Sequence, residues 1–316
     1  MAQSPKIGLA LGSGSARGLA HLGVIRALEE ADIQVAYVAG TSMGALIGAV
    51  YASGNVDSLE TTFQSFDWKR ILSFFDAVFP KSGLIDGTKV EGFVRDHVHA
   101  DIVELLPIPF RAVATDIQSG KEIVIHSGDL IEAVRASIAV PGIFTPVWRD
   151  GRLLVDGGLV NPVPVSVVRA MGADLVIAVD LNHQIVAGKN FKPLNLLKTA
   201  KTTATATPGP MARWVDGCLC SLRELRQKLL ADDAPTAGQF SQWMSKEPLP
   251  NIFELTLASI NIMENSITNY RLGIDKPDIL IRPPLGEFRF LDFWRAEDII
   301  AIGYETAREQ LQQLVT

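Results

Sequence analysis

One stretch of the sequence, Val35-Ala36-Tyr37-Val38-Ala39-Gly40-Thr41-Ser42-Met43-Gly44, decides the fold of this chain. Residues 35–39 are apolar and predict a buried strand, and residues 45–52 predict the helix that follows. Gly-x-Ser-x-Gly at such a junction is typical of a nucleophile elbow, a turn so sharp that side chains at Gly40 and Gly44 would clash with neighbouring backbone. The turn presents Ser42 at the carboxyl end of its strand, where open α/β sheets carry their chemistry. We therefore predict that Ser42 is a nucleophile.

Strand and helix patterns alternate on both sides of this stretch. The chain opens with a strand at residues 7–11, a glycine-rich loop at 12–18 and a helix at 19–31, and residues 55–99 are mostly helical in pattern. Further strands are predicted at 110–115, 122–125, 153–155, 175–179 and 279–281, and further helices at 129–137, at 251–270 and from residue 295 onward. This order predicts an α/β fold with a mostly parallel sheet and helices on both faces.

Composition excludes several classes of protein. The chain has 316 residues, 47% of them hydrophobic, so it can bury a large core. Its net charge of −6, with no basic run interleaved with aromatics, argues against a nucleic-acid surface. The two cysteines, Cys218 and Cys220, point to different faces of one predicted helix and are interpreted as unpaired residues in a reducing compartment. The N-terminus leads straight into a strand, so we expect no signal peptide and a cytoplasmic protein.

The composition changes after Asn182. Residues 187–210 are rich in Lys, Thr, Ala and Pro, and residues 211–229 follow an amphipathic helical pattern. Two interpretations of this helix are open: it packs on the body of the protein, or it forms a lid or membrane-contact surface beside a row of basic residues. We expect one domain over residues 1–316, with a mobile or helical insertion at about 187–250.

A serine hydroxyl is a poor nucleophile until a base takes its proton, so Ser42 needs a partner. Two arrangements compete. In a Ser-His-Asp triad of α/β-hydrolase order, Asp156 and His183 follow Ser42 along the chain as required. In a Ser-Asp dyad the carboxylate acts alone, and no histidine is needed.

The glycine-rich loop Gly12-Ser13-Gly14-Ser15-Ala16-Arg17-Gly18 has the character of an oxyanion-binding loop. Backbone N–H groups can approach a developing negative charge where side chains are small, and the loop opens a helix whose N-terminus favours anions. A dinucleotide site is disfavoured, because the glycines fall at 12, 14 and 18 and the expected acid after the second strand is absent. His21 lies one turn into the helix, close enough to shape the loop.

Three motifs follow one another in order: Gly14-Ser15-Ala16-Arg17-Gly18, Gly40-Thr41-Ser42-Met43-Gly44 and Asp156-Gly157-Gly158. With them the chain resembles the patatin-like phospholipases, and within them the bacterial group similar to the catalytic domain of neuropathy target esterase. The resemblance covers nearly the whole chain, and residues 137–144 and 156–164 also look like family stretches. It implies a three-layer α/β/α fold with a mostly parallel central sheet.

The resemblance also implies roles for single residues. Ser42 and Asp156 would form a catalytic dyad, and the backbone amides of Gly14 and Ser15, with that of Met43, would bind the oxyanion. Many members carry three adjacent glycines in this loop, whereas this chain has Ser13-Gly14-Ser15 with an extra Gly12. The resemblance therefore defines the oxyanion-binding amides only to within about one residue, and Gly12 is among the candidates. Arg17 would steady the loop, bind an anionic headgroup or be solvated. The remaining motif glycines support these turns: Gly18, Gly40, Gly44, Gly157 and Gly158.

The function predicted on this basis is a serine acyl hydrolase that cleaves carboxylic esters of lipids, of phospholipase A or lysophospholipase type, without a metal or other cofactor. Its partner is a lipid or fatty-acyl ester, and nucleic acid is not expected to bind. The alternatives are a thioesterase or acyltransferase that uses the same acyl-enzyme, and a catalytically silent regulatory protein. Peripheral contact with the inner face of a membrane is a further hypothesis.

Overall fold

The computed structural model describes residues 5–65, 86–184 and 252–315. By its contacts the chain divides into two compact units, one made of Met1–Gly188 and Thr256–Thr316, the other of Lys189–Leu255. Nearly all described residues belong to the first unit. The insertion expected at about 187–250 lies outside the described residues, together with its amphipathic helix and both cysteines, and stays a prediction.

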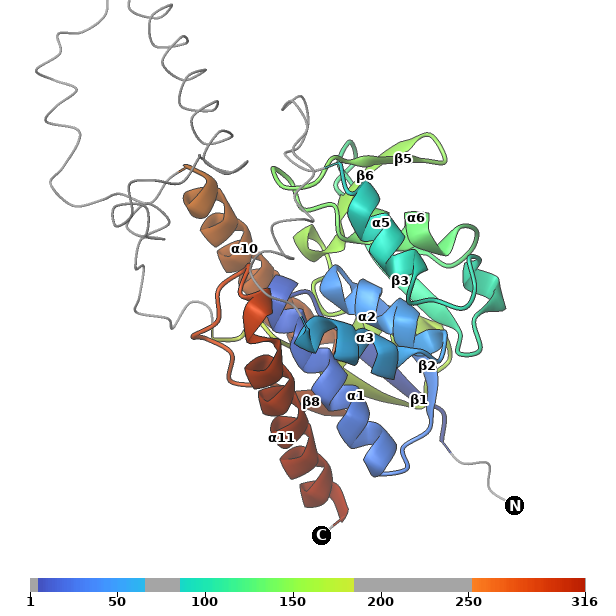
Figure 1. Ribbon diagram of the computed structural model, residues 1–316, viewed down its shortest axis with the longest axis vertical. Helices are drawn as coiled ribbons and strands as arrows, with labels where there is room; N and C mark the ends of the chain where they lie inside the picture. The colour runs from blue at the N-terminus through green and yellow to red at the C-terminus, as the bar shows by residue number, and fades with distance from the viewer. Residues whose placement is uncertain (1–4, 66–85, 185–251, 316) are drawn as a thin grey trace, which may run out of the picture. The chain divides into compact units, whose positions relative to one another are not determined.

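Within the described residues, eight strands form one mostly parallel sheet (Figure 1). The strands are β1 (Ile7–Leu11), β2 (Val35–Thr41), β3 (Phe110–Asp116), β4 (Lys121–Ile125), β5 (Val147–Arg149), β6 (Arg152–Asp156), β7 (Leu175–Val179) and β8 (Ile279–Ile281). They lie in the order β5-β6-β3-β2-β1-β7-β8, with β4 also paired to β3. The pairs from β3 through β2, β1 and β7 to β8 are parallel, while β4, β5 and β6 make antiparallel pairs.

Helices cover both faces of the sheet. They are α1 (Ala20–Glu30), α2 (Met43–Ala52), α3 (Val56–Gln64), α5 (Thr88–Arg95), α6 (Leu130–Ser137), α7 (Val165–Ala170), α10 (Ile252–Asp275) and α11 (Ala296–Val315), with a short 3-10 helix η1 (Ser15–Leu19) ahead of α1. Successive residues of a strand point to opposite faces. Leu9 and Leu11 of β1 accordingly pack in one core with α1, α2 and α11, whereas Ala10 packs in the other with α7 and Leu272 of α10.

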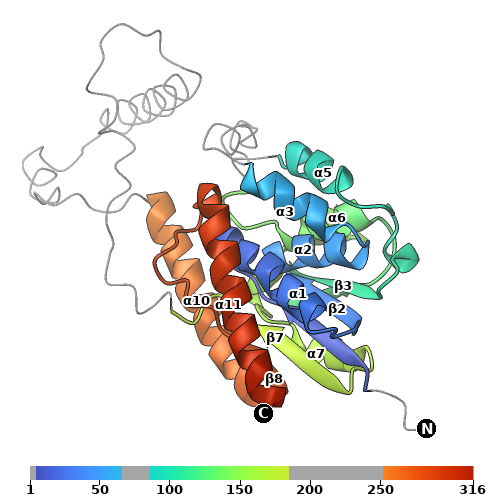
Figure 2. The same ribbon diagram turned by 60° about the horizontal axis from the view of Figure 1, so that its bottom comes forward.

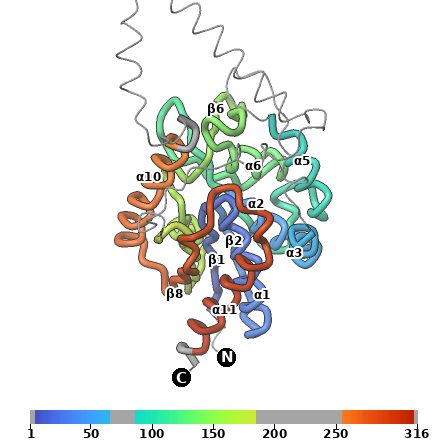
Figure 3. Tube along the Cα trace, turned by 60° about the vertical axis from the view of Figure 1, so that its left-hand side comes forward, coloured from blue at the N-terminus to red at the C-terminus, as the bar shows by residue number. Residues whose placement is uncertain are grey.

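The arrangement is a three-layer α/β/α fold, as predicted. In Figure 2 α1 and α11 run side by side over one face of the sheet, and in Figure 3 α10 and α3 lie on opposite sides of β1 and β2. The uncharged run at residues 35–52 divides into β2 and α2 and is mostly buried, so its apolar side chains form part of the hydrophobic core. Among the described helices none combines the length and apolarity needed to cross a membrane.

The two edges of β3 position the functional site. Strand β4 pairs with residues 112–116 of β3 and so occupies one edge there. On the other edge β2 pairs with residues 110–113 and β6, running in the opposite direction, pairs with residues 114–116. Thr41 is the partner of Val113, and Asp156 is the partner of the next residue, Ala114. Strands β2 and β6 therefore meet end to end, and the turn after Thr41 faces Asp156.

Candidate active site

Ser42 and Asp156 are brought together at this meeting point. The hydroxyl of Ser42 donates a hydrogen bond to Oδ2 of Asp156 over 2.6 Å. The other carboxylate oxygen, Oδ1, accepts the backbone N–H of Gly158 over 2.7 Å. Ser42 is 7% exposed and Asp156 2% exposed. A buried carboxylate in direct contact with a serine hydroxyl is an arrangement that can withdraw the hydroxyl proton.

The sharp turn around Ser42 depends on its two flanking glycines. Ser42 has φ 56° and ψ −123°, a backbone conformation that costs a non-glycine residue about 1–3 kcal/mol. A β-carbon at Gly40 would lie 2.2 Å from the carbonyl oxygen of Gly44, and one at Gly44 would lie 2.2 Å from the carbonyl oxygen of Leu11. Neither position has room for a side chain, so the turn holds Ser42 in a conformation that it would not adopt alone.

The C-terminal end of α6 holds both residues through their backbones. The hydroxyl of Ser137 accepts the N–H of Ser42 over 2.9 Å and donates to the carbonyl of Val113 over 2.6 Å. Two residues further on, the carbonyl of Ala139 accepts the N–H of Asp156 over 3.0 Å. These contacts fix Ser42 and Asp156 against one helix end, so their separation follows from the packing of α6.

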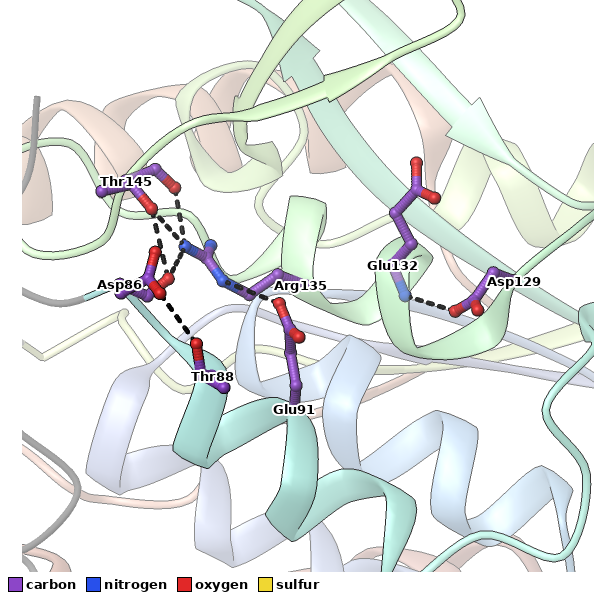
Figure 4. Close-up of polar contacts among 7 residues, drawn as sticks. All are labelled: Asp86, Thr88, Glu91, Asp129, Glu132, Arg135 and Thr145. Atoms are coloured by element: carbon purple, nitrogen blue, oxygen red, sulfur yellow. Dashed lines mark hydrogen bonds and ion pairs between the residues drawn. The ribbon is translucent and has the colours of Figure 1, made fainter. Parts of the chain in front are cut away.

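Arg135, in the last turn of α6, connects the helix to its surroundings (Figure 4). Its Nη2 donates to both the carbonyl and the hydroxyl of Thr145, each over 2.8 Å, and to the carbonyl of Asp86 over 2.5 Å. Its Nε lies 3.8 Å from a carboxylate oxygen of Glu91 on α5. The side chain is nearly fully buried and borders a cavity of about 390 Å³ that Glu132 also lines. Arg135 thus joins α6 to α5 and to the segment before β5.

Some of the backbone N–H groups predicted to bind the oxyanion have no hydrogen-bond acceptor in the described part of the chain, and one of them has. Within the described residues the N–H groups of Gly14, Ser15 and Met43 make no backbone or side-chain hydrogen bond. The N–H of Gly12 donates to the carbonyl of Val179 over 3.1 Å, which extends the pairing of β1 with β7 by one residue. Gly12 is therefore unsuited to the oxyanion role that the sequence left open for it, and the candidates are the three residues with free amides.

Arg17 is buried against the glycine-rich loop, so the interpretation of this residue as solvated is wrong. It is 3% exposed, and its guanidinium donates to the carbonyl of Gly14 over 3.4 Å and to Oδ1 of Asn261 over 3.3 Å. Burial lowers the pKa of Arg17 to about 10, so it keeps its positive charge at neutral pH. Next to it, Gly18 leaves space for the elbow, because a β-carbon there would lie 2.1 Å from Cγ of Met43.

Two histidines stand near the loop and the strand ends. His21 is fully buried, and its Nε2 lies 2.8 Å from the carbonyl oxygen of Gly12. Burial lowers the pKa of His21 to about 4, so it is neutral and shapes the loop as a hydrogen-bond donor. His183 makes no hydrogen bond to Ser42 or Asp156 within the described residues. Burial lowers its pKa, and the charges that act on it are those of Asp180 and Arg282.

The environment of Asp156 shifts its acidity toward neutral pH. Burial raises the pKa of Asp156 to about 6, against the opposing effect of the hydrogen bonds from Ser42 and Gly158. A base works best when its pKa lies near the operating pH. Gly157 supports this turn, because a β-carbon at that position would lie 2.3 Å from the carbonyl oxygen of Val113. Within the described residues no group of three or more His, Cys, Asp or Glu side chains is arranged to hold a metal ion.

Two buried residues of the site were not predicted. Ser137 lies in a stretch singled out only by resemblance, and a serine at a helix end carries no signal of its own. Glu264 of α10 is 8% exposed, and its carboxylate accepts hydrogen bonds from Ser13 of the loop and from Asn182 after β7. A glutamate in an amphipathic helix is normally taken for a surface residue, so only the packing of α10 against the loop identifies it.

Comparison with known proteins identifies the family of the chain. The patatin-like phospholipase family model matches residues 9–169. A protein of Mycobacterium bovis, named an uncharacterized NTE family protein, is 34% identical over 98% of this chain and 92% of its own length. The patatin-like phospholipase domain-containing protein 6 of Homo sapiens is 36% identical over 95% of this chain and 20% of the human protein. The chain belongs to the patatin-like phospholipase family and, within it, is related to the NTE family proteins.

Proposed function

We propose that this protein is a serine acyl hydrolase that cleaves carboxylic esters of lipids, of phospholipase A or lysophospholipase type, through a Ser42–Asp156 dyad. Membership of the family supports lipid hydrolysis in general. The observation that carries the finer proposal is the 2.6 Å hydrogen bond from the Ser42 hydroxyl to Asp156, made without an intervening imidazole.

In the first half of the reaction Asp156 takes the hydroxyl proton while Oγ of Ser42 attacks the carbonyl carbon of the ester. The carbonyl oxygen becomes an oxyanion, and the free N–H groups of Gly14, Ser15 and Met43 are the donors that would stabilise it. When the tetrahedral intermediate collapses, the bond to the alcohol breaks, and the leaving alcohol takes the proton from Asp156. Ser42 is left as an acyl ester.

The second half uses water in place of the alcohol. Asp156, again a carboxylate, takes a proton from water as the water oxygen attacks the acyl carbon. A second oxyanion forms and collapses, the bond to Oγ breaks, and the proton held by Asp156 returns to Ser42. The fatty acid leaves and the dyad is restored. An alcohol or thiol in the place of this water would make the protein an acyltransferase, which is the second candidate activity.

Labelling by a fluorescent fluorophosphonate, read beside the hydrolysis of p-nitrophenyl butyrate, tests the proposal on wild type, Ser42→Ala, Asp156→Asn and His183→Ala. We expect both signals to vanish in the first two variants and to survive in the third. Loss of both signals in a folded His183→Ala variant would favour the triad instead. If wild type gives neither signal, the catalytically silent alternative gains support. Release of an acylated alcohol when an alcohol is supplied would favour the transferase.

Peripheral membrane contact is proposed on the exposed side of α10. Several large apolar side chains lie there between 50% and 72% exposed, namely Ile262, Met263, Tyr270 and Ile274. An enzyme that acts on lipids must meet a lipid surface, and an uncharged apolar row can insert into one. The variant Ile262→Asp with Ile274→Asp should sediment less with anionic liposomes than wild type, whereas Leu105→Asp, at a 70% exposed residue elsewhere, should not. Equal sedimentation of all three proteins would contradict this contact.

A further inference from the structure

A second buried carboxylate, that of Glu264, lies beside the proposed dyad. It belongs to α10, and one of its oxygens, Oε2, accepts the hydroxyl of Ser13 over 3.0 Å and the amide of Asn182 over 3.1 Å. The same amide lies 3.2 Å from the Ser13 hydroxyl, so the three side chains form a closed ring of contacts. The ring is anchored at its other side, because the backbone N–H of Ser13 donates to the carbonyl of Pro162.

The second oxygen of Glu264 faces the turn that carries Asp156. A β-carbon at Gly158 would lie 2.3 Å from Oε1 of Glu264 and 3.1 Å from Oδ1 of Asp156, so both carboxyl groups border the space left by this glycine. Gly158 also donates its N–H to Oδ1 of Asp156. Glu264 therefore accepts a hydrogen bond from the glycine-rich loop with one oxygen, while the other lies next to Gly158 of the Asp-Gly-Gly turn.

The charges around Glu264 decide its protonation. Burial and the like charge of Asp156 raise the pKa of Glu264 to about 8, while Arg17 of η1 acts in the opposite direction. The positive charge of Arg17 is shared with Asp180 and Asp292, and the buried His21 at the start of α1 is neutral. The raised pKa favours the protonated form of Glu264 at neutral pH. Since Oε2 already accepts two hydrogen bonds, the proton belongs on Oε1, on the side of Gly158.

We propose that Glu264 is a positioning residue: its carboxyl group holds the glycine-rich loop beside the turn that carries Asp156, and ionisation of this group lowers the activity. The tie acts through Ser13, whose neighbours Gly14 and Ser15 carry the free amides. Ionisation places a negative charge beside the amides that must bind an oxyanion, and a charge there opposes the one that develops in the reaction. The inference rests on the proposed acyl hydrolase activity.

The experiment is the pH profile of kcat/KM for p-nitrophenyl butyrate from pH 5 to 10, with Ser42→Ala as the blank for spontaneous hydrolysis. Wild type should lose activity above about pH 8, the pKa of Glu264. Glu264→Gln has the shape of the neutral acid and cannot ionise, so its activity should stay level in that range. Glu264→Ala breaks the tie and should be about tenfold less active at every pH, as expected for the loss of a buried hydrogen bond. The exposed Glu297→Gln on α11 is the matched control and should keep the wild-type profile.

The same alkaline loss in Glu264→Gln as in wild type would overturn the inference. Melting temperatures of the two proteins give a second readout that needs no activity. Because the pKa of Glu264 is raised in the folded protein, wild type should lose stability relative to Glu264→Gln as the pH rises toward about 8. A wild type without any esterase activity would instead overturn the proposed function, and a constant difference in melting temperature would show that Glu264 does not titrate in this range.

Discussion

The hydroxyl of Ser137 accepts the backbone N–H of Ser42 over 2.9 Å. This contact explains how the elbow can be buried, because a buried N–H without a partner costs about 1–3 kcal/mol. The same hydroxyl donates to the carbonyl of Val113, the β3 residue that pairs with Thr41. One side chain therefore satisfies a donor in the turn and an acceptor in the neighbouring strand, and it fixes the turn to the sheet.

Removing that hydroxyl should weaken both fold and activity. In Ser137→Ala a donor on Ser42 and an acceptor on Val113 lose their partner, so we expect a loss of about 1–3 kcal/mol in the free energy of unfolding. A small shift of the elbow should also lower kcat by about tenfold or more. Urea unfolding and ester hydrolysis measure the two effects. Ser266→Ala removes an exposed hydroxyl from α10 and should change neither, and a Ser137→Ala variant equal to it would contradict the prediction.

The acid side of the activity profile should report Asp156. Its pKa is raised to about 6 by burial, so kcat/KM should fall below about pH 6 as the carboxylate gains a proton and can no longer act as a base. Asp156→Asn should be inactive at every pH. The exposed Asp150→Asn should keep the wild-type profile. An acid limb near the ordinary pKa of an aspartate would show that burial does not perturb this group.

The glycines of the elbow and of the exposed helices should respond in opposite directions to the same substitution. Gly44→Ala would place a β-carbon 2.2 Å from a backbone oxygen of Leu11, which has no room to move, so we expect unfolded or inactive protein. Gly273→Ala on α10 meets nothing within 4 Å, and alanine is favoured over glycine within a helix by about 1 kcal/mol. Thermal unfolding of the two variants separates these outcomes. A stable, active Gly44→Ala would mean that the turn is wider than described.

Much of the site could be predicted because its signals are local. The pattern at residues 35–52 already contains β2, the elbow and α2, and the order of three motifs indicates both Ser42 and Asp156. The rest depends on contacts between distant segments. Whether Gly12 has a free amide depends on how far β1 stays paired with β7, and the role of Glu264 depends on α10 packing against a loop near the other end of the chain. Neither property has a pattern in the neighbouring residues.

The position of Asp156 should reduce the stability of the folded protein. The ordinary pKa of an aspartate is 3.8, and the pKa of Asp156 in the folded protein is about 6. Between these two pH values Asp156 is ionised in the unfolded chain but mostly protonated in the folded protein. A group with a raised pKa contributes its full stability below the unfolded pKa and loses it as the pH rises through the folded pKa. At pH 8 the stability lost through this ionisation is about 3 kcal/mol, since each pKa unit corresponds to about 1.4 kcal/mol.

Asp156→Asn should therefore unfold at a higher urea concentration than wild type at pH 8, although it is inactive, and the gain should shrink as the pH approaches 4. The asparagine keeps a carbonyl oxygen for the N–H of Gly158, and its amide faces Ser42 as a donor, so the hydrogen bond to the Ser42 hydroxyl is reversed in direction and the burial of a charge is removed. Asp150→Asn, at an exposed residue, should show no such gain at either pH. If Asp156→Asn were less stable than wild type at pH 8, the carboxylate would be stabilised by its two hydrogen bonds more than burial destabilises it, and its pKa would lie below that of a free aspartate.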